Sequence, residues 1–174
     1  MKRLITFITA AFIGYSLGYA QEVTGAADKV NLYNTQVKVF HSQIIADDFY
    51  LFISFPDDYD QSDKKYPVLY LLDGDVTFGM ATSIARYLQF GNKIPELIIV
   101  GIGYGTLKKS EGNMKSRDYT ISPKRGRSET GGAPKFREFL KEELIPYIEV
   151  TYRATPDERT ISGYSLGSLF AIDT

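Results

Sequence analysis

The sequence has 174 residues, of which 44% are hydrophobic and 24% charged, and its formal net charge is -1. These values exclude a wholly disordered chain, and the near-neutral charge favours neither nucleic acid nor an anionic membrane as a partner. The absence of cysteine excludes disulfides, thiol catalysis and a cysteine-linked lipid anchor. A chain of this length can bury one substantial core, so we expect a single domain. Its single histidine leaves only one candidate for a histidine base.

The first twenty residues follow the three-part pattern of a secretory signal peptide. Lys2 and Arg3 precede an apolar stretch, and Ala20 ends a small-residue cleavage pattern before Gln21. The apolar stretch is shorter than the roughly 20 residues that span a bilayer. We therefore expect residues 1–20 to be removed. The mature protein should have no membrane span and be periplasmic or secreted.

Four runs of residues predict strands in the first part of the mature chain. The β-rich runs at 37–41 and 50–55, separated by Asp47-Asp48, predict a hairpin. The runs at 66–72 and 97–100 are continuously apolar, without the alternation of a strand that has one face in water. Strands of this kind are covered on both faces, as the strands of a parallel sheet are.

Helical patterns alternate with these strands. Residues 76–90 predict a helix that ends at Gly91, and an apolar stripe over 136–148 predicts a second one. Pro146 should kink or end the second helix. A short strand is expected at 159–162. Strands separated by helices imply βαβ crossovers, so the sequence predicts an α/β protein with a three-layer α/β/α sandwich.

Residues 163–167, Gly-Tyr-Ser-Leu-Gly, fit the pattern G-x-S-x-G and lie between a predicted strand and helix-forming residues. A serine in such a tight turn has a strained backbone, and residues larger than glycine two positions away would clash. The turn exposes the hydroxyl of Ser165 and directs the amide of Leu166 at a substrate oxygen. The pattern predicts Ser165 as a catalytic nucleophile and Leu166 as an oxyanion donor. The alternative is a glycine-rich structural turn.

A second oxyanion donor is expected in the loop after the first buried strand. Asp73-Gly74-Asp75 ends that strand, and glycine lets a ligand approach the backbone closely. The amides of Gly74 and Asp75 are therefore candidates. The alternative is that these residues only form a turn.

Residues 101–130 form a long polar segment after the second buried strand, at the sheet edge where α/β proteins bind ligands. Its cations include Arg117, Lys124 and Arg125, which are candidates for binding an anionic or catecholate substrate. A solvated basic loop is the alternative. Arg117 and Asp118 can equally form an ion pair that fixes the segment.

The sequence predicts neither a cofactor nor a metal site. Gly101, Gly103 and Gly105 follow a buried strand, but the sixth position of a dinucleotide-binding loop is Thr106 and no helix pattern begins there. No metal-ligand spacing occurs anywhere in the chain.

Four blocks together resemble a known family: Tyr66-Pro-Val-Leu-Tyr-Leu-Leu-Asp-Gly-Asp75, Arg117-Asp-Tyr-Thr120, Gly131-Gly132 and Gly163-Tyr-Ser-Leu-Gly167. Their order is similar to that in the "Putative esterase" family of α/β hydrolases, which includes esterase D, feruloyl esterases and siderophore esterases. The resemblance implies an α/β-hydrolase fold and a serine hydrolase of small-molecule carboxylic esters. It also implies an acyl-enzyme on Ser165, with oxyanion amides at Leu166 and near Gly74.

The end of the chain departs from this family. The family's acid and histidine follow the nucleophile, whereas Asp173 is the only carboxylate after Gly167 and no histidine follows. His41 precedes Ser165 on an early strand, and we expect it to be an ordinary strand residue. Residues 21–174 are therefore expected to be an esterase domain that lacks its C-terminal strands and two triad residues.

Two other functions stay open at this stage. A catalytically inactive binding protein would keep the pocket without the triad, and the DNA downstream of codon 174 would distinguish it from a truncated enzyme. An acyltransferase on the same fold would pass the acyl group to a sugar rather than to water. Product analysis with and without an acceptor would identify it.

Overall fold

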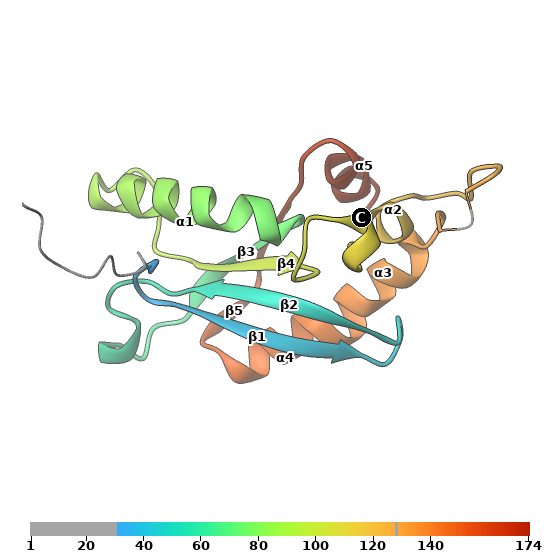
Figure 1. The fold of residues 1–174 in the computed structure, drawn as a ribbon. Helices are drawn as coiled ribbons and strands as arrows, with labels where there is room; N and C mark the ends of the chain where they lie inside the picture. Colours follow the sequence, from blue (N-terminus) through green and yellow to red (C-terminus); the bar gives the residue numbers. More distant parts are fainter. Residues whose placement is uncertain (1–30, 128) are drawn as a thin grey trace, which may run out of the picture. The chain divides into compact units, whose positions relative to one another are not determined.

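Residues 31–127 and 129–174 are described by the computed structural model, and they contain a mixed five-stranded sheet with helices on both faces (Figure 1). The predicted signal peptide, residues 1–20, lies outside the described residues. The sheet has the order β1-β2-β4-β3-β5. Its strands are β1 (Thr35–Ser42), β2 (Asp47–Ser54), β3 (Tyr66–Leu71), β4 (Ile98–Gly103) and β5 (Ala154–Ser162).

The predicted hairpin is confirmed, but its turn lies earlier than expected. β1 and β2 pair antiparallel, with Ser42 opposite Asp47, so both predicted turn aspartates belong to β2. The amide of Ala46 donates to the carbonyl of Ser42 at 2.9 Å, and Ala46 has a positive φ of 59°. The turn therefore spans residues 43–46. Asp48 is available to pair with His41 across the two strands.

The predicted buried strands are confirmed as the parallel centre of the sheet. β3 pairs parallel with both β4 and β5, while β2 pairs antiparallel with β4. Every residue of β4 is buried. Parallel strands connected through helices place their carboxyl ends at one edge, and the segments that follow β3, β4 and β5 start from that edge.

Helices cover both faces of the sheet, which confirms the three-layer architecture. On one face α1 (Gly74–Phe90) packs Phe78 and Ala85 against Leu71 and Ile99. The other face is covered by α3 (Ala133–Phe139), η3 (Leu140–Leu144), α4 (Ile145–Thr151) and α5 (Leu166–Asp173). The described residues also contain the short helical segments η1 (Tyr59–Gln61), η2 (Lys109–Glu111) and α2 (Lys115–Asp118). No helix in the described part of the chain is long and apolar enough to cross a membrane.

Pro146 does not end the second predicted helix. The chain passes from α3 through η3, a single π-helical segment, into α4, and Pro146 stands in the first turn of α4. Leu144 and Ile145, directly before the proline, keep helical dihedral angles, so the helix continues past Pro146. Phe136, Leu144 and Ile148, one from each segment, are all fully buried. The apolar stripe therefore stays on the sheet across the π-helical turn.

Candidate active site

The structure places Ser165 in the turn that joins β5 to α5. Its φ of 54° and ψ of -115° lie outside the regions that residues with a side chain normally adopt. A methyl group added at Gly163 would lie 2.4 Å from the carbonyl carbon of Gly167, so only glycine fits at this position. Strained backbone of this kind persists where surrounding structure holds it, and it occurs often at functional sites.

Ser165 is accessible to solvent. Ser165 is exposed, and within residues 31–127 and 129–174 its hydroxyl makes no hydrogen bond, whereas its carbonyl accepts one from the Ser168 hydroxyl at 2.6 Å. Leu166 is the first residue of α5. Its amide is therefore among the first-turn N–H groups that have no partner inside the helix.

The loop between β3 and α1 also has a constrained backbone. Asp73 has a left-handed φ of 55°, and α1 begins directly after it at Gly74. A methyl group at Gly74 would lie 2.6 Å from the carbonyl carbon of Gly101 in β4. The sequence suggested that Gly74 admits a ligand. The structure gives it another reason, because this glycine lets the start of α1 lie against β4.

The turn at residues 163–167, called the elbow below, is adjacent to this loop. The amide of Leu72 donates to the carbonyl of Ser162 at 2.9 Å, because β3 and β5 are neighbouring parallel strands. A methyl group at Gly167 would lie 3.4 Å from the Leu72 side chain and 3.6 Å from a carboxylate oxygen of Asp73. The segments that contain the predicted oxyanion donors therefore meet at the carboxyl edge of the sheet.

Arg117 is held by two carboxylates. Its Nε donates to Asp118 at 2.7 Å, a second nitrogen donates to the other Asp118 oxygen at 3.0 Å, and a third reaches Asp47 at 2.9 Å. Burial raises the pKa of Asp118 above its usual value, although the hydrogen bonds from Arg117 oppose that shift. This geometry favours the structural ion pair, and substrate binding by Arg117 stays a prediction.

Lys124 and Arg125 lie in an exposed turn closed by an isolated bridge between Lys124 and Arg127. The amide of Lys124 donates to the Thr130 hydroxyl at 2.8 Å. No contact in the described part of the chain joins these two cations to the elbow. Their role in binding substrate stays a prediction.

His41 lies on β1, at the opposite edge of the sheet from β5. Four strand spacings of about 4.8 Å separate the two edges, so His41 is on the order of 19 Å to the side of Ser165. Its Nδ1 contacts Asp48 at 2.7 Å.

Asp173, near the end of α5, pairs with Arg137. Within the described residues, no group of three or more potential metal ligands comes together.

Sequence reasoning missed four contacts that hold the loop after β3. The Tyr119 hydroxyl accepts from the Asp73 amide at 3.2 Å, and Lys115 lies 3.3 Å from the Asp73 carboxylate. The Asp75 carboxylate accepts from two amides after β4. The block from Arg117 to Thr120 held a signal for these contacts, because Tyr119 is an aromatic residue within a polar segment. The structure buries both Asp118 and Tyr119.

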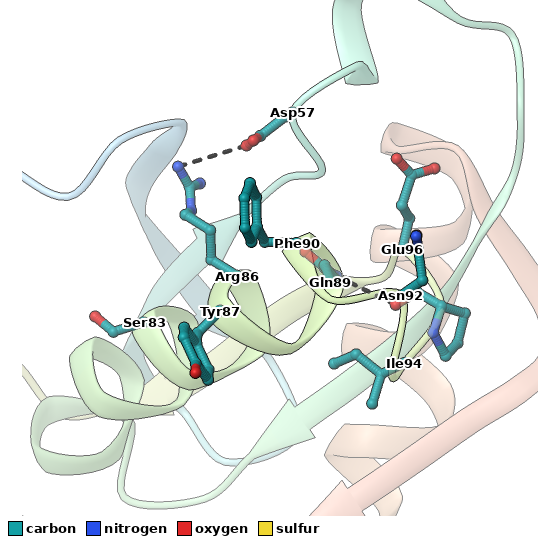
Figure 2. A pocket seen from close by; sticks show the side chains of 10 residues that line it. Asp57, Ser83, Arg86, Tyr87, Gln89, Phe90, Asn92, Ile94 and Glu96 are labelled. Carbon is teal, nitrogen blue, oxygen red and sulfur yellow. Dashed lines mark hydrogen bonds and ion pairs between the residues drawn. The ribbon is translucent and has the colours of Figure 1, made fainter.

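A separate hollow lies at the far end of α1 (Figure 2). Its walls include Phe90 and Arg86, and Arg86 pairs with Asp57 at 3.4 Å. Its lining on α1 runs from Ser83 to Phe90, which lie about 14 to 24 Å along the helix from Gly74. It takes no part in the site at the elbow.

Comparison with known proteins points to one family. A model of the family described as "Putative esterase" matches residues 42–174. The ferri-bacillibactin esterase BesA of Bacillus subtilis (strain 168) is 34% identical over 164 residues, covering 85% of this chain and 55% of that protein.

Two solved structures agree with this match. The BES protein from Bacillus cereus has a TM-score of 0.72 and 30% identity, and the match covers 84% of this chain and 57% of the BES protein. An IroE-like serine hydrolase from Shewanella oneidensis has a TM-score of 0.69 and 32% identity, and the match covers 80% of this chain and 45% of the hydrolase. The chain thus spans about half the length of the proteins it matches.

Proposed function

Because the chain belongs to the "Putative esterase" family of α/β hydrolases, we propose that it acts in carboxylic ester hydrolysis with Ser165 as the nucleophile. The observation that carries the proposal is the backbone of Ser165, which is strained, exposed and located between a parallel strand and a helix. A turn with a purely structural role does not require an exposed serine in strained backbone. A nucleophile in a G-x-S-x-G turn requires both features, because they present its hydroxyl to the substrate.

The proposed reaction begins with attack of the Ser165 hydroxyl oxygen on the ester carbonyl carbon. The carbonyl oxygen becomes an oxyanion, which accepts hydrogen bonds from the amide of Leu166 and from that of Gly74 or Asp75. A base takes the proton of the Ser165 hydroxyl during the attack. Collapse breaks the ester C–O bond, and that proton passes to the leaving alcohol, which leaves an acyl-enzyme. Water then hydrolyses the acyl-enzyme, which releases the carboxylic acid and restores the Ser165 hydroxyl. The described residues bring no histidine to Ser165, so the base in this scheme is not assigned to any of them.

The proposed substrates are siderophore-type esters. The support is the 34% identity to a ferri-bacillibactin esterase. The exposed cations Lys124 and Arg125 are proposed to assist binding of such anionic, catechol-bearing molecules. Arg117 is proposed to act through its ion pairs with Asp118 and Asp47, with direct binding of substrate as the alternative.

The nucleophile is tested by Ser165→Ala in the complete gene product, with hydrolysis of an aryl acetate and of a catecholate trilactone as readouts. We expect kcat to fall by at least about a thousandfold, because the hydroxyl that forms the acyl-enzyme is lost. Ser83→Ala is the matched control, since Ser83 is an exposed serine on α1 that bonds only within its helix. Full turnover by Ser165→Ala would refute the proposal. Substrate binding without turnover by the unaltered protein would identify a binding protein.

Export is the second part of the proposal, with residues 1–20 as the cleaved signal peptide. The expected result is a mature protein outside the cytoplasm whose N-terminal sequence begins at Gln21. Ala20→Arg should block cleavage, because the position before the cut requires a small residue. Ala26→Arg, beyond the cut, should leave cleavage unchanged. A cytoplasmic protein that retains Met1 would contradict the assignment.

A further inference from the structure

The two sides of the proposed oxyanion hole are held in different ways. Leu166 is fixed by its place in α5, within a regular helix that packs Phe170 into the core. The Gly74 and Asp75 side follows the left-handed residue Asp73, and its position depends on hydrogen bonds from another segment. That segment is residues 104–120, which follow β4.

The Asp75 carboxylate forms the first of these links. One oxygen accepts from the Tyr104 amide at 2.7 Å and the other from the Gly105 amide at 2.9 Å. Gly103 makes room for this carboxylate, since a methyl group there would lie 2.5 Å from one of its oxygens. Both carboxylate oxygens of Asp75 are therefore used to bind the start of α1 to the chain after β4.

The Tyr119 hydroxyl forms the second link. It accepts a hydrogen bond from the Asp73 amide at 3.2 Å, immediately before the proposed donors. Only 1% of Tyr119 is exposed, and its ring packs against Phe136 and Phe170. A side chain this buried cannot contact a substrate, so its hydroxyl acts on the backbone of the loop alone.

The first link is anchored to a buried carboxylate, that of Asp118, which directly precedes Tyr119 in the chain. The Tyr104 hydroxyl donates to Asp118 at 2.9 Å, and Arg117 binds both oxygens of Asp118 while reaching Asp47 on β2. The Asp118 side chain is only 1% exposed. A buried, fully paired network of this kind has one favoured arrangement, because any displaced member leaves a polar group unpaired.

We propose that Asp75, through its carboxylate, and Tyr119 are positioning residues that hold the Gly74 and Asp75 amides in the geometry required of oxyanion donors. The inference rests on the proposed function, because it presumes that an oxyanion forms at Ser165. Such donors act at about 2.7–3.1 Å from the oxyanion, and a misplacement of about 1 Å can lower the rate by on the order of a hundredfold. Neither side chain makes or breaks a bond in the reaction.

The test compares Tyr119→Phe with Tyr66→Phe in the complete gene product. Tyr66 is 2% exposed and its hydroxyl donates to Asp58 at the other end of the sheet, so the control removes the hydroxyl of a similarly buried tyrosine away from the site. We expect Tyr119→Phe to lower kcat and the affinity for an arylboronic acid, which mimics the tetrahedral intermediate, by about tenfold each. KM should change less than twofold, and Tm should fall no further than in Tyr66→Phe.

Asp75→Asn provides a second variant if Tyr119→Phe does not fold, with Asp58→Asn as its control. An asparagine accepts from only one of the two amides and presents an N–H to the other, so kcat should again fall about tenfold or more. If kcat and boronate affinity are the same in the site and control variants, the inference is overturned. The proposed function still stands in that case, provided that Ser165→Ala is inactive. Turnover by Ser165→Ala would overturn both.

Discussion

At the scale of single residues, two glycines of this chain differ in the space available for an added methyl group. Gly163 faces the backbone of Gly167 across the elbow, where an added methyl group would lie 2.4 Å from a carbonyl carbon. Gly79 lies inside α1, and a methyl group there would meet only the Leu32 side chain, at 3.8 Å. The same substitution should therefore act in opposite directions at the two sites.

We predict that Gly163→Ala lowers the free energy of unfolding by about 1–3 kcal/mol or more, because backbone atoms must move to admit the methyl group. Gly79→Ala should raise it by about 0.5–1 kcal/mol, since alanine loses less conformational freedom in a helix. Urea denaturation of both variants measures the difference. Similar stabilities for the two variants would contradict the close packing of the elbow.

The residues of the site were predictable only where a local pattern defines them. The G-x-S-x-G pattern predicts a strand-to-helix turn at Ser165, and the structure has one. The contact between Tyr119 and the Asp73 amide joins residues 46 positions apart, which no local pattern encodes. Gly74 was singled out for ligand approach, whereas its close partner is the backbone of Gly101.

At the scale of elements, the sequence predicted the strands and helices better than their boundaries. Continuous apolar runs identified β3 and β4, because central parallel strands are covered on both faces. The hairpin turn was misplaced at Asp47-Asp48, since acidic residues usually favour turns. Here Asp47 is bound by Arg117, 70 positions away, and so has a partner while remaining in β2.

The helix over α3, η3 and α4 shows how tertiary packing overrides a local signal. Proline in a helix predicts a break, because it removes an N–H and crowds the preceding turn. The structure inserts a π-helical segment before Pro146 instead, and the apolar stripe remains buried on either side of it. Burial of several large side chains outweighs one poorly bonded turn.

At the scale of the whole described unit, β5 is the edge strand next to two apolar surfaces. One lies towards α1 and includes Leu69, Met80 and Ile84. The other, on the opposite face, includes Tyr70 and Ile161. β5 pairs only with β3 among the described residues, so its second edge has free backbone groups beside exposed apolar side chains. This combination favours association between chains.

We predict that the 174-residue chain, expressed alone, self-associates through the β5 side and binds a hydrophobic dye. Met80→Lys should reduce both effects, because Met80 is 63% exposed on the α1 surface beside β5. Val39→Lys is the matched control, since Val39 is 60% exposed on β1 at the opposite sheet edge. Sedimentation velocity and dye fluorescence measure the outcome. A monomeric parent chain, or an equal effect of Val39→Lys, would show that the β5 side does not drive association.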